Sequence, residues 1–368
     1  MGCDPSNPTE VEVKYQVSTR HSGLTTGELV RATRKSATGD SQFSRRGFLR
    51  AASTLGLGSL AGCAERKPTW KKGGYRKTDR SRVAILKAAG YDSDLTSVIL
   101  DGIKSFRLDV LGKRVLLKPN LVEYERDTVI NTHPSVIGAA IEAFLKLGAK
   151  EVKVGEGPGH RRDTDGLLLA SGLYPFLKDT KTQFVDLNLD DIRPVSLQSD
   201  FMGIDSLYFS DSVLQADLLV SMPKLKTHHW AGMTLSMKNL FGIIPGLKYG
   251  WPKNFLHWHG IYESIIDINS TIRSHFAIVD GIVGMEGNGP IQGTPKPVGV
   301  LVFGDDPVAV DATCARVAGL NPERIEYLKN AGDFLGNLGE AQIQQIGSEV
   351  SKVQAHFQVI KEFHYLQS

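Results

Sequence analysis

The chain has 368 residues, of which 41% are hydrophobic and 23% are charged, and its formal net charge is +3. A chain of this length can bury one large core or two modest ones, so we expect a globular protein. No basic stretch is interleaved with aromatic residues, and this pattern speaks against a nucleic-acid partner.

The first 62 residues differ in composition from the rest of the chain. Residues 1–43 are polar and rich in Ser, Thr, Gly and charge, which predicts a disordered leader. Residues 44–62 contain Arg45-Arg46 followed by Phe48-Leu49 and a short apolar run, and they lead into Cys63. The run is too short and too rich in Gly and Ser to span a bilayer. The segment resembles a twin-arginine export signal that ends in a lipoprotein cleavage box.

This resemblance implies a location and two partners. The twin-arginine export machinery would carry the protein across the membrane, and lipid on Cys63 would anchor it to the membrane surface on the extracytoplasmic side, periplasmic or cell-surface. Residues 63–81 are strongly basic and predict either a tether near an anionic membrane or an ordinary solvated linker. With Cys3 removed and Cys63 acylated, only Cys314 remains free, so a cysteine-ligated iron–sulfur cluster is not expected within this chain.

From Arg82 onward, strand-like and helix-like segments alternate. Short apolar runs predict strands over residues 82–87, 113–117, 151–154, 183–186, 217–221, 275–279 and 298–303. Apolar residues at helical spacing predict helices over residues 94–106, 134–147, 163–170, 259–272 and 306–317. This alternation predicts an α/β fold with a mostly parallel sheet flanked by helices. We expect the α/β domain over residues 82–336, followed by a C-terminal extension over residues 337–368.

Charged residues and glycines follow five of the predicted strands. In open α/β sheets, ligands bind outside the carboxyl ends of the strands, so we expect a polar site at that edge. The residues concerned are Lys118 and Asn120; Glu156, Gly157 and Gly159; Lys224, Lys226 and His228; Asp280, Glu286, Gly287 and Gly289; and Asp306 and Asp311.

The segment from Lys224 to Lys248 is the densest of these and contains no Asp or Glu. Converging lysines suit an anionic small molecule such as a phosphate or a carboxylate, and a desolvated lysine can also act as a base or nucleophile. The alternative is a solvated loop whose lysines pair with distant carboxylates. We predict a catalytic set of Lys224, Lys226, His228 and Lys238, with ligand binding by Lys118, Asn120, Glu156, Gly157, Gly159, Asn239, Lys248, Gly287 and Gly289.

Four acids form the complementary set: Asp280, Glu286, Asp306 and Asp311. Converging carboxylates can hold a divalent metal through oxygen ligands. They can equally neutralise the lysines in a buried network of salt bridges. The sequence leaves both interpretations open.

Six blocks in a fixed order resemble the family known as domain of unknown function 362. They are residues 117–121, 155–159, 216–228, 237–242, 280–290 and 306–312, and the resemblance covers roughly residues 82–320. Some members carry an iron–sulfur module, for which this chain lacks the cysteines, so a redox role would need a redox partner protein.

The sequence supports three hypotheses about function. The first is an exported enzyme acting on an anionic small molecule, and the second is a non-catalytic ligand- or metal-binding lipoprotein. The third is an accessory or assembly lipoprotein for a membrane redox system.

Overall fold

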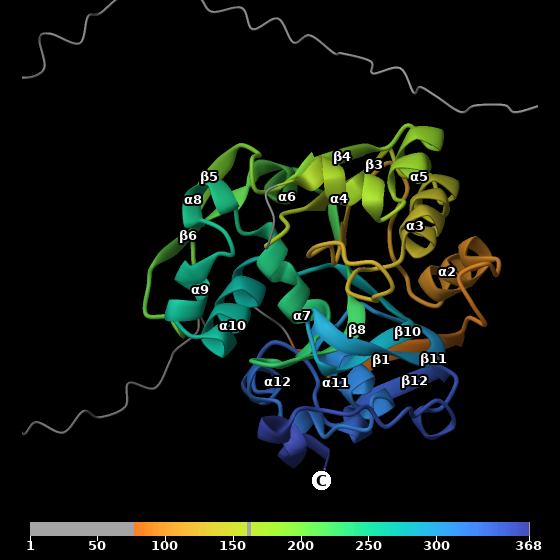
Figure 1. The fold of residues 1–368 in the computed structure, drawn as a ribbon, viewed down its shortest axis with the longest axis vertical. Coiled ribbons are helices and arrows are strands. Elements are labelled where there is room, and N and C mark those ends of the chain that lie inside the picture. Colours follow the sequence, from red (N-terminus) through yellow and green to blue (C-terminus); the bar gives the residue numbers. More distant parts are fainter. Residues whose placement is uncertain (1–76, 160–162, 368) are drawn as a thin grey trace, which may run out of the picture. The chain divides into compact units, whose positions relative to one another are not determined.

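The computed structural model describes residues 77–159 and 163–367 (Figure 1). The predicted leader, the export signal with Cys63, and nearly all of the basic tether lie outside the described residues. Within the described ranges, no helix has both the length and the apolar character needed to cross a bilayer.

A large mixed sheet runs through the described part of the chain. Its strands follow the order β12-β1-β11-β10-β7-β2-β3-β4, and the run from β10 to β4 is parallel. The predicted α/β class, with a mostly parallel sheet, is therefore confirmed. The strands are β1 (Ser81–Lys87), β2 (Arg114–Pro119), β3 (Glu151–Glu156), β4 (Gln183–Asp186), β7 (Leu218–Met222), β10 (Phe276–Asn288), β11 (Gln292–Gly304) and β12 (Ile343–Gly347).

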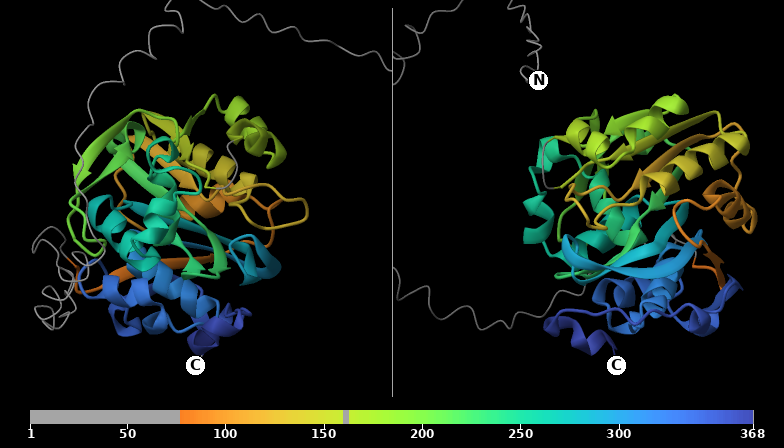
Figure 2. Two further views of the ribbon diagram at one scale, coloured as in Figure 1. Left: turned by 60° about the vertical axis from the view of Figure 1, so that its left-hand side comes forward. Right: turned by 45° about the vertical axis from the view of Figure 1, so that its right-hand side comes forward.

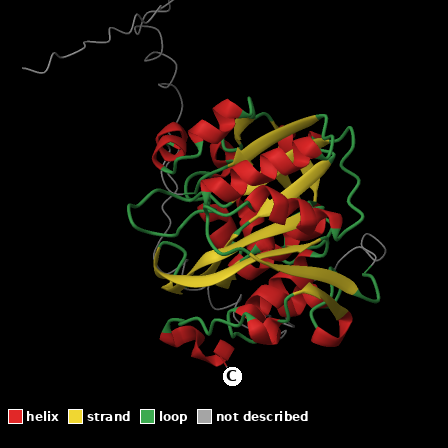
Figure 3. Cartoon of the chain, turned by 90° about the vertical axis from the view of Figure 1, so that its right-hand side faces the viewer, coloured by secondary structure: helices red, strands yellow, loops and turns green. Residues whose placement is uncertain are grey.

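Helices cover both faces of this sheet (Figures 2 and 3). One face packs against α2 (Leu95–Lys104), α3 (Pro134–Lys146), α4 (Thr164–Ala170) and α5 (Tyr174–Asp179). The other packs against α7 (Ser236–Asn239), α10 (Ile261–Thr271), α11 (Pro307–Val317) and α12 (Glu326–Gly332). Successive side chains of a strand point to opposite faces of the sheet. In β2, Leu117 packs into the apolar core under α2 and α3, and Leu116 packs into the core under α10 and α11.

The remaining elements lie mostly beside the second face. A separate hairpin pairs β5 (Ile192–Ser196) with β6 (Ser206–Ser210), and short helices occupy Asp211–Gln215 (α6), Gly246–Tyr249 (α8) and Asn254–Trp258 (α9). The single helix predicted over residues 259–272 begins later than expected, at Ile261 in α10, after the turn that ends α9.

Local sequence sets the ends of the long helices. Helix α3 begins with Pro134 at its first position, and the His133 side chain accepts a hydrogen bond from the Ser135 N–H. Helix α11 likewise begins with a proline, preceded by Asp306, whose carboxylate accepts from the Val308 and Ala309 N–H groups. Asp306 is therefore a helix cap rather than a ligand at the site edge.

The direction of β11 corrects the expected layout. Residues 298–303 were expected to add another parallel strand, but β10 and β11 form an antiparallel ribbon in which Gly304 pairs with Ala277 at the start of β10. The end of β11 and the adjoining Asp306 therefore lie at the opposite edge from the carboxyl ends of β2 and β3. An apolar run looks the same in either strand direction, so the sequence pattern could not reveal the reversal.

Two further segments expected outside the sheet belong to it. Residues 280–288, which follow the strand predicted over 275–279, continue β10. Strand β12 pairs in parallel with β1, so residues 343–347 of the expected C-terminal extension belong to the sheet.

Strand β8 (Lys224–His228) occupies a segment after β7 for which no strand was predicted, and it rules out the alternative of a solvated loop there. It leaves β7 at Pro223 and pairs with the later part of β10, where Lys224 lies opposite Asp280 and Lys226 opposite Met285. Strand β9 (Gly232–Thr234) returns beside it in antiparallel pairing. Strand β10 continues beyond its pairing with β7. Strand β8, which pairs with this later part, therefore lies beyond the carboxyl ends of the parallel strands.

Helix α7 is held from outside by a buried carboxylate on α11. The residue before α7, Leu235, provides no side-chain cap. Asp311 instead accepts from the Ser236 N–H at 2.7 Å and the Met237 N–H at 3.0 Å. Burial raises the pKa of Asp311 well above its ordinary value, and the two amide donors oppose this effect. Asp311 therefore positions the helix that carries Lys238 and Asn239.

Replacing Asp311 with alanine should lower the free energy of unfolding by about 2–4 kcal/mol, because two buried N–H groups lose their acceptor. Asp311→Asn retains one carbonyl oxygen and should lose about half as much. Urea unfolding followed by circular dichroism measures both variants. An alanine variant as stable as the unmodified protein would show that α7 does not depend on this cap.

Candidate functional site

A cavity of about 110 Å³, called the lysine cavity below, lies at the carboxyl ends of β2 and β3, with β8 and α7 beside it. Nine residues singled out from the sequence line it: Lys118, Asn120, Glu156, Gly157, Gly159, Lys226, His228, Lys238 and Asn239. The structure thus brings together side chains from four separate elements. Their roles in ligand binding or catalysis stay predictions.

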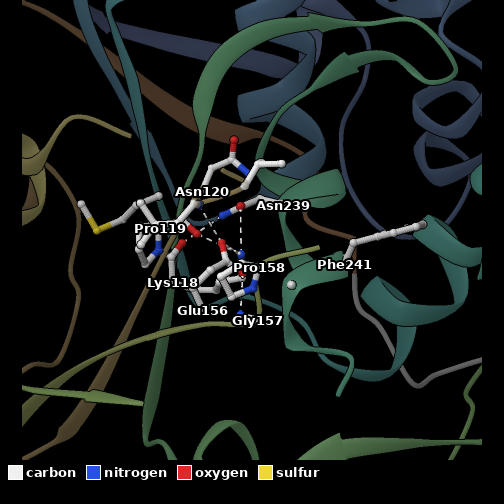
Figure 4. Close-up of polar contacts among 12 residues, drawn as sticks. Lys118, Pro119, Asn120, Glu156, Gly157, Pro158, Asn239 and Phe241 are labelled. Carbon is white, nitrogen blue, oxygen red and sulfur yellow. Dashed lines mark hydrogen bonds and ion pairs between the residues drawn. The ribbon is translucent and has the colours of Figure 1, made fainter. Parts of the chain in front are cut away.

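A buried ion pair forms one side of the lysine cavity (Figure 4). The Lys118 Nζ lies 2.7 Å from the Glu156 Oε2, and both side chains are at most 2% exposed. Glu156 also accepts from the Leu121 N–H through Oε2 and from the Gly157 N–H through Oε1, each at 2.9 Å. Burial lowers the pKa of Lys118, and the Glu156 carboxylate opposes the shift.

Asn239 joins this pair to α7. Its Oδ1 accepts from the Lys118 Nζ at 3.1 Å, and its Nδ2 donates to the Lys118 carbonyl at 2.9 Å and to the Ser221 Oγ at 3.1 Å. These bonds tie the ends of β2 and β7 to the helix. Asn239 therefore holds the ion pair in place.

Gly242 allows the chain to close over the ion pair. A Cβ at this position would collide with the Glu156 carboxylate and the Lys118 ammonium group. Any larger residue would have to push apart two buried charged groups, so we infer that only glycine fits here.

Three further lysines reach the lysine cavity without a carboxylate partner among the described residues. Lys226 donates to the carbonyls of Ile130 at 2.8 Å and Pro290 at 3.2 Å. Lys253 donates to the Gly157 carbonyl at 2.8 Å and to other carbonyls nearby. The half-buried Lys238 places its Nζ 3.8 Å from the centroid of the Phe241 ring.

These environments disfavour the ammonium forms. Burial, with a smaller contribution from the Lys118 charge, lowers the pKa of Lys238 to about 7. Burial also lowers the pKa of Lys253 to about 7. Burial lowers the pKa of Lys226 well below its ordinary value, and the charges of Lys238 and Lys224 lower it further.

His228 presents a neutral ring to the lysine cavity. Its Nδ1 accepts from the Trp230 and Ala231 N–H groups at 3.0 and 3.1 Å, so the proton of the neutral ring resides on Nε2. Burial lowers the pKa of His228 well below its ordinary value, and the Lys238 charge adds to the effect. The Nε2–H can therefore donate a hydrogen bond to a ligand.

Two buried oxygens beside the lysine cavity have no hydrogen-bond partner within the described residues. They are the Oδ1 of Asn120 and the Oγ of Thr234, and both side chains are less than a tenth exposed. Buried polar atoms are nearly always paired, so these two indicate a site that the protein alone does not complete.

Lys224, predicted with the catalytic set, belongs to a neighbouring cluster instead. Its Nζ lies 2.6 Å from the Asp280 Oδ2 and donates to the Tyr91 hydroxyl at 2.9 Å. The Tyr91 ring stacks on His133 with centroids 3.7 Å apart. A separate cavity of about 130 Å³ adjoins this cluster. Lys224 is therefore neutralised and does not line the lysine cavity.

Three predicted ligand-binding residues also lie elsewhere. Lys248 is exposed, with its Nζ 4.6 Å from the centroid of the Tyr208 ring. Gly287 pairs with Gly293 within the β10–β11 ribbon, and Gly289 packs against the Thr227 carbonyl. The two glycines shape the ribbon rather than the cavity lining, and Lys248 lies on α8.

Each of the four acids has its own protein partners, and the salt-bridge interpretation holds for Asp280. Asp280 pairs with Lys224, and Asp306 and Asp311 cap helices. Glu286 accepts from the Gln358 N–H at 2.8 Å and lies 3.3 Å from the Lys296 Nζ. Across residues 77–159 and 163–367, no group of three His, Cys, Asp or Glu side chains is placed to hold a metal ion.

Sequence reasoning missed Lys253 and Thr234, which also line the lysine cavity. Nothing in their local sequence marks them, since tertiary packing alone brings them there. A signal was available for β8, because residues 224, 226 and 228 alternate as they would on one face of a strand.

Comparison with known proteins places the chain in a family. A family model described as "Domain of unknown function (DUF362)" matches residues 115–316, more than half of the chain, so the chain belongs to this family. The match contains every described residue that lines the lysine cavity. The family description names no reaction.

Two individual proteins are similar to the chain. Thylakoid-associated protein sll1697 from Synechocystis sp. is 31% identical over 223 residues, which cover 58% of this chain and 65% of that protein. The chain thus spans slightly less than two thirds of that relative's length. The lactate racemase apoprotein from Thermoanaerobacterium thermosaccharolyticum is a similar solved structure, with a TM-score of 0.42 and 15% identity over 66% of this chain and 58% of that chain.

Lys118→Met should lower the free energy of unfolding by about 3–5 kcal/mol, because it leaves the Glu156 carboxylate buried without its cation. The double variant Lys118→Met/Glu156→Gln should lose less free energy of unfolding than the sum of the losses in the two single variants. The reason is that no unpaired charge stays buried when both charges are removed. A double-mutant cycle measured by urea unfolding gives the coupling free energy. Additive losses would mean that the two charges do not stabilise each other.

Proposed function

We propose that this chain binds a small anion, either a carboxylate or a phosphate-like oxyanion, in the lysine cavity. The family is named for its unknown function, so the proposal rests on the chemistry of the site itself. Lys226, Lys238 and Lys253 are the groups expected to contact the anion, with His228 donating through Nε2–H.

The observation that carries this proposal is a charge imbalance. Among the described residues lining the lysine cavity there are four lysines and one carboxylate, and that carboxylate is already paired with Lys118. An unpaired buried ammonium group is costly, and proteins relieve the cost by losing the proton or by binding an anion. A bound anion would supply the missing negative charge.

The dimensions and polarity of the lysine cavity suit a small ligand. A volume of about 110 Å³ holds a few water molecules at about 30 Å³ each, or one small anion. The unpartnered oxygens of Asn120 and Thr234 offer further hydrogen bonds to a ligand or to water beside it. A divalent metal has less support, because the predicted acidic ligands are occupied elsewhere.

Millimolar sulfate or acetate, at fixed ionic strength, should raise the thermal unfolding temperature of the protein. A ligand at ten times its Kd stabilises the native state by about 1.4 kcal/mol. The stabilisation should be larger at about pH 6 than at about pH 8.5, because the ammonium groups of Lys238 and Lys253, with a pKa of about 7, lose their charge in between. Sulfate keeps its charge over this range, so the change reports on the protein.

Matched variants separate site binding from general salt effects. Lys226→Met should abolish the sulfate-induced increase, whereas Lys248→Met, at an exposed lysine outside the lysine cavity, should retain it. Lys253→Met provides a second test if Lys226→Met folds poorly. Equal stabilisation of all these proteins, or none in the unmodified protein, would rule out the proposed site.

We further propose that the protein is exported and held at a membrane by lipid. The support is the sequence of residues 44–63, together with the name of the curated relative, which describes that protein as thylakoid-associated. A membrane-tethered anion-binding protein would meet its ligand on the extracytoplasmic side.

Cys63→Ser should move the protein from the membrane fraction to the soluble extracytoplasmic fraction, because the acylated thiol is lost. Replacing Arg45 and Arg46 with lysines should leave the precursor inside the cell. Immunoblots of fractionated native cells measure both outcomes. A Cys63→Ser protein that stays exported and membrane-bound would overturn the lipid anchor.

A further inference from the structure

Lys238 differs from the other lysines of the lysine cavity in what its amine contacts. Lys118 binds a carboxylate, while Lys226 and Lys253 donate to backbone carbonyls. The Nζ of Lys238 instead lies over the Phe241 ring, and no oxygen of the described residues accepts a hydrogen bond from it. This amine therefore has no hydrogen bond to break before it reacts.

We propose that Lys238 forms a Schiff base with a small 2-oxo acid whose carboxylate is bound by the neighbouring lysines. The inference rests on the proposed anion binding and adds a reacting group to it. A 2-oxo acid carries a carboxylate for Lys226 and Lys253 and, on the adjacent carbon, an electrophilic carbonyl for Lys238. The cavity volume of about 110 Å³ accommodates small members such as pyruvate or glyoxylate.

The reaction balances without an oxidant or a reductant. The ammonium group of Lys238 first releases a proton, and the free lone pair attacks the carbonyl carbon to form a C–N bond. The resulting carbinolamine oxygen takes up a proton and leaves as water, which yields the iminium ion. One ammonium group and one carbonyl thus become one iminium group and one water molecule, with no change in total charge.

The surroundings of Lys238 favour each part of this reaction. A pKa of about 7 leaves a large share of the Lys238 amine unprotonated at neutral pH. The neutral His228 ring can donate through Nε2–H to the carbonyl or carbinolamine oxygen. Lys226 and Lys253 line the same cavity, and the negative charge of a bound carboxylate would favour their ammonium forms.

Borohydride trapping tests the proposal on the full chain. The protein is incubated with pyruvate, treated with sodium borohydride, and examined by intact mass spectrometry and peptide mapping. Borohydride would deliver hydride to the iminium carbon and leave a stable secondary amine. We expect one reduced pyruvyl group per chain on the peptide containing Lys238, a decrease in labelling with excess acetate, and no such adduct in Lys238→Arg.

Lys248→Arg is the matched control, because Lys248 also lies over an aromatic ring but is exposed. Its labelling should equal that of the unmodified protein. Absence of an adduct, or an adduct that persists in Lys238→Arg, would overturn the Schiff-base proposal. Stabilisation by sulfate without an adduct would leave anion binding supported and the Schiff base rejected. An adduct on Lys238 without stabilisation by sulfate or acetate would support the Schiff base. It would reject carboxylate binding by Lys226 and Lys253.

Discussion

The buried ion pair between Lys118 and Glu156 fixes the geometry of the candidate site. Removing two charges from water is costly, and such a pair persists only when its remaining donors and acceptors are satisfied. Here the N–H groups of Leu121 and Gly157 donate to the Glu156 carboxylate, and the Asn239 side chain accepts from Lys118. The ends of β2, β3 and α7 are thereby held in one arrangement. Every other group of the lysine cavity is placed relative to this fixed pair.

The balance of charge then distinguishes the two neighbouring clusters on β8. Lys224 meets Asp280 and is neutralised, whereas Lys226, two residues later on the same strand, meets only carbonyl oxygens. Carbonyl dipoles stabilise an ammonium group less than a carboxylate does, so positive potential remains around Lys226. Strand β8 therefore carries a neutralised salt-bridge network at Lys224 and, two residues later, a lysine without a counter-charge at the cavity.

Much of the fold could be predicted from sequence, because apolar runs and helix caps are local signals. The polar residues after β2 and β3 were also found correctly, since parallel neighbours end at one edge. The reversal of β11 could not be found, because its apolar pattern does not depend on strand direction. That reversal explains why Asp306 lies away from the lysine cavity. Lys253 was missed for another reason: only the packing of α9 brings it to Gly157.

The residues that line the lysine cavity extend along the chain from Lys118 to Pro290. Contacts between such distant residues form only when most of the sheet and its helices have assembled, and their closure carries a large loop entropy. Complete desolvation of the lysines therefore requires that the strands and helices that carry them are assembled. No short fragment of the chain can contain the site, so occupancy of the lysine cavity would report on the native topology as a whole.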